Sequence, residues 1–137
     1  MAAALNGKWE IYSSENFENF MKAIGVTPEN IEKATKALDA NSKLTHEISG
    51  SGNSWSIKTT TIMGEKEIKF NLGEEFSTAT LDGRPVKVTF TLEGDKLVEV
   101  QKGDGFESRN ERSVSGGELV AIMSGNGVSC TRKYKKI

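Results

Sequence analysis

Cysteine, histidine and proline are scarce in this chain, with one cysteine, one histidine and two prolines among 137 residues. A single cysteine excludes a disulfide within the chain and fits the reducing cytosol. One cysteine and one histidine are too few for the usual zinc site, so we expect no metal. No apolar run approaches the roughly 18 residues of a spanning helix, and no basic, apolar leader begins the sequence. These absences together predict a cytoplasmic protein.

Neither sign of charge dominates, because 18 basic residues face 19 acidic ones and the formal net charge is −1. A nucleic-acid-binding domain usually carries an overall basic footprint, so nucleic acid is not expected as a partner. The glycines interrupt extended segments, and none opens a helix in the GxGxxG manner of a phosphate-binding loop. We therefore expect no nucleotide and no other cofactor.

Two short helices are predicted early in the chain, after a first strand at residues 6–12. Ser13 and Ser14 offer an N-cap, and apolar residues then recur with helical spacing until Gly25. Thr27 and Pro28 start the second helix, with threonine at the N-cap and proline at the first helical position. The apolar stripes consist of Phe17, Phe20, Met21 and Ile24, and of Ile31, Ala34 and Leu38. We expect a helical hairpin at about residues 15–39.

From residue 44 onward the apolar pattern has a period of two, which is typical of strands with one buried face. The alternation is clearest at residues 86–92, where Val86, Val88 and Phe90 share a face. Glycines recur between these segments, and Asn126-Gly127 is the strongest hairpin signal. Counted with the first strand, the segments make an antiparallel meander of about ten strands. A sheet of that size tends to close, because closure removes its exposed edges.

The expected inner faces carry too many polar groups for a packed core. Along the last strand, Arg132 and Tyr134 share a face with Val128 and Cys130. Arg112 likewise shares a face with apolar residues at 106 and 114. A buried guanidinium needs an anion or water beside it. The sequence therefore predicts a hollow, water-containing barrel that holds an anion, although a solvent-facing Arg112 is the simpler alternative.

Several motifs resemble those of the intracellular lipid-binding protein family, which includes fatty-acid-binding and cellular retinoic-acid-binding proteins. They are Gly7-Lys8-Trp9, Ser14-Glu15-Asn16-Phe17, Leu72-Gly73-Glu74-Glu75-Phe76, Asp82-Gly83-Arg84, Gln101-Lys102 and Cys130-Thr131-Arg132-x-Tyr134. The resemblance covers essentially the whole chain and implies one lipid-binding domain over residues 1–137. It implies an all-β fold, a ten-stranded antiparallel up-and-down β-barrel of two near-orthogonal sheets, capped by a helix-turn-helix between strands 1 and 2.

The resemblance also implies a site for the carboxylate of an internal ligand, formed by Arg112, Arg132 and Tyr134. Arginine at both positions favours an acid over an alcohol, because related retinol carriers have glutamine there. Residues implied to line the ligand tail or the portal are Phe17, Phe20, Met21, Ile24, Val26, Met63, Leu81, Ala121 and Met123. The helical residues among them could equally form ordinary helix core.

We expect a monomeric, non-enzymatic carrier of a long-chain fatty acid, with a bile acid or retinoic acid as the alternative ligand. A lipid isomerase or synthase acting through Cys130 is a hypothesis of another class, disfavoured because the only histidine, His46, lies far away in sequence. A third hypothesis is a structural, membrane-associated protein with an incidental lipid. We call the helical hairpin at about residues 15–39 the lid. Lys22, Lys33 and Lys36 could give the lid a basic face toward anionic membranes, or they could simply be a solvated helix surface.

Overall fold

The computed structural model describes residues 2–39, 42–62, 64–80 and 83–137. A short 3₁₀ helix, η1 (Ala2–Leu5), precedes the first strand, and the helices α1 (Phe17–Ala23) and α2 (Pro28–Leu38) follow it. The ten strands are β1 (Gly7–Glu15), β2 (Thr45–Ser51), β3 (Ser54–Thr61), β4 (Gly64–Asn71), β5 (Phe76–Ala79), β6 (Pro85–Glu93), β7 (Lys96–Gly103), β8 (Phe106–Ser115), β9 (Glu118–Gly125) and β10 (Val128–Lys136). The predicted ten-stranded meander with a helical hairpin after strand 1 is confirmed.

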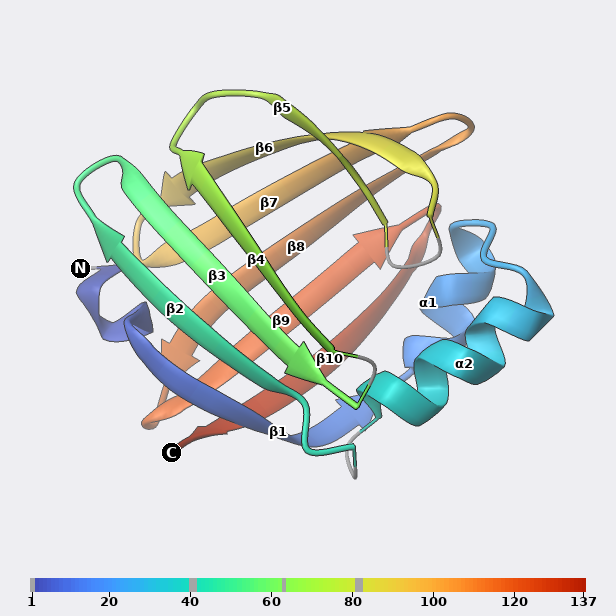
Figure 1. The fold of residues 1–137 in the computed structure, drawn as a ribbon, viewed down its shortest axis with the longest axis horizontal. Helices are drawn as coiled ribbons and strands as arrows, with labels where there is room; N and C mark the ends of the chain where they lie inside the picture. Colours follow the sequence, from blue (N-terminus) through green and yellow to red (C-terminus); the bar gives the residue numbers. More distant parts are fainter. Residues whose placement is uncertain (1, 40–41, 63, 81–82) are drawn as a thin grey trace.

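The strands form one antiparallel sheet in the order β4-β3-β2-β1-β10-β9-β8-β7-β6-β5. Strands that follow one another in the chain pair with each other, except β4 and β5, which form the two edges of the sheet. In addition, β1 pairs with β10 and thereby joins the two ends of the chain. Figure 1 shows β2, β3 and β4 crossing in front of β7, β8 and β9, so that the sheet wraps around on itself. The helices lie at one end of this barrel, and both termini lie at the opposite end.

The sheet ends at β4 and β5, and aromatic side chains fill the space between these two edge strands. Phe70 of β4 stacks on Phe90 of β6 with ring centroids 3.7 Å apart. Phe76 of β5 lies parallel to Phe90 at 6.1 Å. Lys66 adds a direct bridge, since its Nζ donates to the carbonyl of Ala79 at 3.1 Å. Packing and one side-chain hydrogen bond therefore replace the ladder here and nearly close the barrel.

The predicted N-cap at Ser13 and Ser14 is wrong, because both serines belong to β1. The register of β1 on β10 shifts between Ile11 and Ser13, and pairing then continues to the end of the strand. The helix α1 begins after Asn16, whose φ of 65° is left-handed and whose side-chain amide donates to the Ser129 carbonyl at 2.8 Å. Pairing with a strand more than a hundred residues away overrides the local capping signal of the serines.

The second helix begins as predicted. Thr27 is the N-cap and its hydroxyl accepts a hydrogen bond from the Asn30 amide at 3.4 Å, while Pro28 occupies the first helical position. Gly25, which follows α1, has a φ of 84°, a conformation that favours glycine. The lid therefore follows directly from local sequence signals, apart from the point where α1 starts.

Two glycines of the barrel wall each make room for an aromatic residue directly across the ladder. Gly50 pairs with Trp55, and a Cβ at Gly50 would lie only 2.1 Å from the indole. Gly103 pairs with Phe106, and a Cβ there would lie 2.2 Å from the phenyl ring. Arg84 in turn lies over this ring, 4.2 Å from its centroid. These glycines permit close backbone–ring packing that any larger residue would prevent.

Candidate ligand-binding site

Arg132 is buried on the inner face of β10 and is only 2% exposed. Alternation along the strand places it between Cys130 and Tyr134, which are also buried. Its Nε donates to the Tyr134 hydroxyl at 3.4 Å, and its guanidinium lies 4.1 Å above the Phe17 ring. A further guanidinium nitrogen donates to the carbonyl of Leu38, the last residue of α2. Arg132 thus faces the interior and touches both helices of the lid.

Arg112 is also buried, at 8% exposure, and the sequence-based prediction that it faces the interior is correct. It pairs with Ala121 on β9, and Arg132 pairs with the same alanine from the other side. The two arginines therefore stand at one level of the barrel wall, two strand spacings or about 10 Å apart at their Cα atoms. Only the small side chain of Ala121 separates them on this face.

The two arginines differ in their electrostatic surroundings. Arg112 Nη1 lies 2.8 Å from Oε1 of Glu99, a carboxylate that is itself buried on β7. The other oxygen of Glu99 accepts from Gln101 Nε2 at 2.5 Å. Among the described residues no carboxylate forms an ion pair with Arg132, which contacts neutral oxygens and an aromatic ring. Arg112 is thus already neutralised, whereas Arg132 keeps an uncompensated positive charge.

His46 of β2 joins Arg112, Arg132 and Tyr134 in one polar group on the inner wall. In the sheet, β2 and β8 lie on different sides of β10, so His46 and Arg112 flank Arg132 and Tyr134. Its Nδ1 and the Thr59 hydroxyl are 2.9 Å apart, and its ring lies 5.1 Å from the Tyr134 ring. Burial of the imidazole, together with the positive charges of Arg112 and Arg132, lowers its pKa to about 3. At neutral pH the histidine is therefore uncharged. With Glu99 cancelling Arg112, this group of residues has a net charge of +1, which suits one monovalent anion.

Several inward-facing residues around this group are only partly buried, including Thr59, Asn110 and Met123. Alternation along each strand places them on the same face as buried residues such as Ile57 and Arg112, and that face is the inner one. Each of the three keeps part of its surface accessible in the structure. Two open surface hollows, of about 690 and 680 Å³, lie elsewhere and contain neither arginine.

The lid residues divide between two apolar clusters. Phe20 and Met21 are buried against Ile31 of α2 and Cys130 of β10, which matches the helix-core alternative. Phe17 and Ile24 are partly buried and contact both this cluster and the main barrel core. Of the other residues implied to line the tail, Val26 and Met123 border the cluster of Phe20 and Met21, and Ala121 belongs to the barrel core. Met63 and Leu81 lie outside the described residues.

Cys130 is buried at 2% exposure and lies in contact with the lid. Burial raises the pKa of its thiol to about 11, although Arg132 acts in the opposite direction. The thiol is therefore protonated at neutral pH and is a poor nucleophile. In the described part of the chain, no cluster of three or more His, Cys, Asp or Glu side chains is arranged to bind a metal ion.

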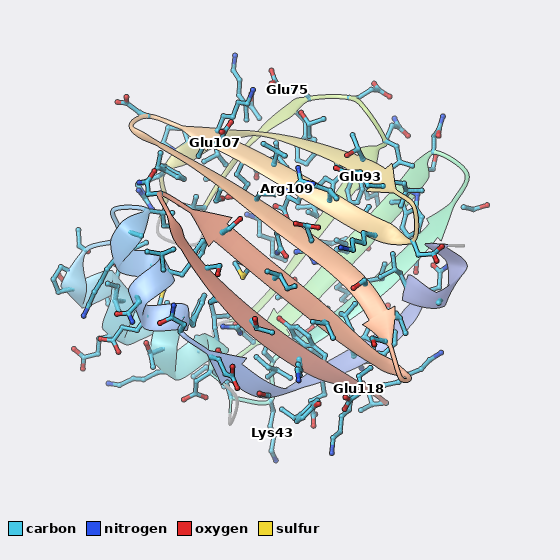
Figure 2. The ribbon with its side chains drawn as sticks, turned by 180° about the vertical axis from the view of Figure 1, so that it is seen from behind. Lys43, Glu75, Glu93, Glu107, Arg109 and Glu118 are labelled. Carbon is cyan, nitrogen blue, oxygen red and sulfur yellow. The ribbon has the colours of Figure 1, made fainter. Side chains whose placement is uncertain are left out.

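The outer face of the sheet carries ion pairs of its own, which are separate from the interior. Arg109 of β8 lies 2.8 Å from Glu93 and 3.4 Å from Glu111, and Figure 2 shows Arg109 and Glu93 on the back of the barrel. The lid lysines that were candidates for membrane contact are also paired within their helices. They form Lys22–Glu18, Lys33–Glu29 and Lys36–Glu32 pairs at 3.5, 3.7 and 3.4 Å. Each lysine is thus matched by a glutamate one turn earlier.

Glu99 and Gln101 are the interior residues that sequence reasoning missed. On β7 the residues Val98 and Val100 are both apolar, which suggests that they face the core. In the structure the opposite face, with Leu97, Glu99 and Gln101, points inward, while Val98 is buried on the other face. Glu99 could have been predicted from Arg112 on the neighbouring strand. Once Arg112 faces inward, a carboxylate on an adjacent strand is its expected counterion.

Comparison with known proteins gives a consistent result along the whole chain. Residues 6–137 match the model of the Lipocalin / cytosolic fatty-acid binding protein family. The chain is 42% identical over 137 residues to the sodium/calcium exchanger regulatory protein 1 of Doryteuthis pealeii, covering 100% of this chain and 99% of that one. It is 41% identical to fatty acid-binding protein 12 of Mus musculus, with full coverage of both.

A solved structure described as the REP1-NXSQ fatty acid transporter superposes with a TM-score of 0.88 at 41% identity. The match covers 98% of this chain and 97% of the other. Within the described residues, no helix combines the length and the apolar character needed to cross a membrane.

Proposed function

The chain belongs to the lipocalin / cytosolic fatty-acid binding protein family, and we propose that it is a monomeric, cytoplasmic carrier of a long-chain fatty acid. The family is one of binding proteins and not of enzymes, which agrees with the protonated, buried thiol of Cys130. In this proposal the fatty acid lies inside the barrel, with its carboxylate toward Arg132 and its tail among the apolar residues of the wall and lid.

The observation that carries the proposal is the uncompensated guanidinium of Arg132 on the inner wall. A buried charge without a counterion is costly, and a ligand carboxylate would remove that cost. The flat fork of arginine donates two parallel hydrogen bonds to a carboxylate, and these are stronger than neutral ones. Tyr134 lies within 3.4 Å of the Arg132 Nε, so its hydroxyl would add a neutral donor to the same head group.

Arg112 has a supporting role in this proposal because one of its nitrogens is held by Glu99. Its remaining N–H groups stay available as donors, directly or through a bridging water. The neutral state of His46 matters equally, since a protonated histidine would add a second positive charge and a different hydrogen-bond pattern. The proposed site therefore has one full positive charge for one carboxylate.

The tail would supply most of the binding free energy. Each buried methylene contributes about 0.8 kcal/mol, so a chain of some sixteen carbons contributes on the order of 12 kcal/mol before losses. The loss of translational and conformational freedom offsets several kcal/mol of this gain. A micromolar dissociation constant corresponds to about 8 kcal/mol, which leaves room for these costs. The carboxylate contacts then fix the direction of the ligand more than its affinity.

Two measurements test the proposal. Mass spectrometry of lipids extracted from the purified protein should identify free fatty acids, whereas a bile acid or retinoic acid would replace the fatty acid as the ligand. Competition against a fluorescent fatty acid should then show that octadecanoic acid binds more tightly than its methyl ester. Equal affinity for the acid and the ester would mean that the carboxylate is not recognised, and the proposed role of Arg132 would be lost.

A second proposal concerns contact of the lid with anionic membranes. The three lid lysines are exposed, but each has a glutamate partner in its own helix. Such exposed pairs are weak and can rearrange near an anionic surface. Unchanged transfer of ligand to anionic vesicles by a Lys33→Glu/Lys36→Glu variant would remove this proposal without affecting the carrier function.

A further inference from the structure

Asn110 is an inward-facing residue of β8 with an unused hydrogen-bond acceptor. Its Oδ1 is buried and receives no hydrogen bond from the described residues. Asn110 precedes Arg112 by two residues on β8, so alternation places both side chains on the same face. An acceptor that is removed from water and left without a donor is unfavourable, so such groups usually have a partner in the functional state.

The register of the sheet places a second acceptor directly beside Asn110. Glu99 of β7 is its cross-strand partner on one side, and Met123 of β9 is its partner on the other. Cross-strand partners have Cβ atoms about 5 Å apart, so their side chains share one patch of the inner wall. Both Glu99 oxygens already accept a hydrogen bond, from Arg112 and from Gln101. A carboxylate has about four acceptor positions, so further capacity remains.

We call Glu99, Gln101 and Asn110 the acceptor cluster. The cluster lies one pleat nearer the lid than the two arginines, because Arg112 pairs with Ala121 while Asn110 pairs with Met123, next to the lid. From the strand spacing and rise, the Cα atoms of Asn110 and Arg132 are about 12 Å apart. A fatty acid with its carboxylate at Arg132 and its tail toward the lid would pass this cluster with its carbon chain.

We infer that the acceptor cluster is a second polar subsite, which takes a hydroxyl group on the chain of the bound lipid acid. The ligand O–H donates to Asn110 Oδ1, and the ligand oxygen accepts a remaining N–H of Arg112 or Gln101. This inference rests on the proposed function, because the carboxylate at Arg132 sets the distance between the two subsites. The favoured ligand class is therefore hydroxylated fatty acids, and plain fatty acids leave the Asn110 oxygen without a donor.

The test compares octadecanoic acid with a series of hydroxyoctadecanoic acids that carry the hydroxyl near the carboxylate, at mid-chain or near the methyl end. Competition against a fluorescent fatty acid gives their relative affinities. For the best-placed hydroxyl we expect binding about tenfold tighter than for octadecanoic acid, the effect of one hydrogen bond to an otherwise unsatisfied acceptor. An Asn110→Leu variant should lose this preference while still binding octadecanoic acid.

The matched control is Asn71→Leu, the same substitution at an exposed position of β4. It should keep the preference for the hydroxylated acid. Binding of octadecanoic acid reports that each variant is folded, and Asn110→Ala serves as a second variant if the leucine disrupts the barrel. Equal affinity of the wild-type protein for every acid in the series would overturn the inference, as would a preference that survives in both Asn110 variants. Failure to bind any acid would instead contradict the proposed function itself.

Discussion

Glu99 accepts a hydrogen bond from Arg112 across the β7–β8 ladder, with 2.8 Å between the carboxylate oxygen and the guanidinium nitrogen. Both side chains are almost fully buried, so the pair is an internal feature of the barrel. The consequence is an asymmetry between two arginines that look equivalent in the sequence. Arg112 has its counterion within the protein, whereas Arg132 has none among the described residues.

Replacing Arg132 with glutamine should weaken fatty-acid binding by at least about 1 kcal/mol, because a charged hydrogen-bond donor to the carboxylate is lost. The affinity for the methyl ester should change less, since the ester carries no charge. Competition with a fluorescent fatty acid measures both values. Arg109→Gln is the matched control: Arg109 faces outward in an ion pair with Glu93, and its loss should leave affinity unchanged. Equal weakening by the two substitutions would contradict the assigned role of Arg132.

Replacing Glu99 with glutamine should lower the free energy of unfolding by about 3 kcal/mol, because it leaves Arg112 buried without its counterion. Urea denaturation of the ligand-free protein measures this effect. Glu111→Gln provides the control, since Glu111 pairs with Lys96 and Arg109 on the outer face and should contribute less than about 1 kcal/mol.

The same Glu99→Gln substitution should tighten binding of a fatty acid, because the interior then carries two uncompensated guanidiniums and the added carboxylate partly replaces Glu99. Stability and affinity thus move in opposite directions. A Glu99→Gln protein with unchanged stability would show that the pair is exposed to water in solution.

His46 should give stability a specific dependence on pH. Its pKa is about 3 in the folded protein and near 6.5 when unfolded. Between these values the unfolded chain binds the extra proton, so the stabilising contribution is complete above about pH 6.5 and is lost as the pH falls toward 3. In a His46→Gln variant, the slope of unfolding free energy against pH in that window should decrease by up to about 1.4 kcal/mol per pH unit.

Proton NMR offers a direct check of this shift, because His46 is the only histidine in the chain. The imidazole resonances of the folded protein should stay in their neutral positions down to about pH 4. Titration with a midpoint near 6.5 in the folded protein would show that the ring is hydrated and that the interior gains a second positive charge below about pH 6.5.

Cys130 should react slowly with iodoacetamide at pH 8 in the native protein and rapidly in denaturant, because the thiol is buried and its pKa is raised to about 11. Mass spectrometry of the alkylated chain follows the reaction. Fatty-acid binding by Cys130→Ala should remain within about threefold of wild type, since the loss of a small buried side chain mainly affects packing. Loss of a lipid conversion in this variant would revive the enzyme hypothesis.

The sequence was sufficient for the architecture because its signals are local. Period-two alternation places Arg112, Arg132 and Tyr134 on inner faces, and this holds whatever the strands pair with. The helix stripes, the cap at Thr27 and the glycine after α1 likewise depend on neighbours within a few residues. A chain that alternates in this way for ten segments has few ways to bury one face, so a barrel with a helical cap follows.

What the sequence left open is which side chains meet across strands. The start of α1 depends on the pairing of β1 with β10, and the counterion of Arg112 depends on the register of β7 against β8. On β7 the apolar residues Val98 and Val100 lie on the outer face and Glu99 on the inner one, so alternation alone favours the wrong face. Register is a property of the assembled sheet. For that reason only the tertiary structure decided that Glu99 neutralises Arg112 and that Arg132 has no counterion among the described residues.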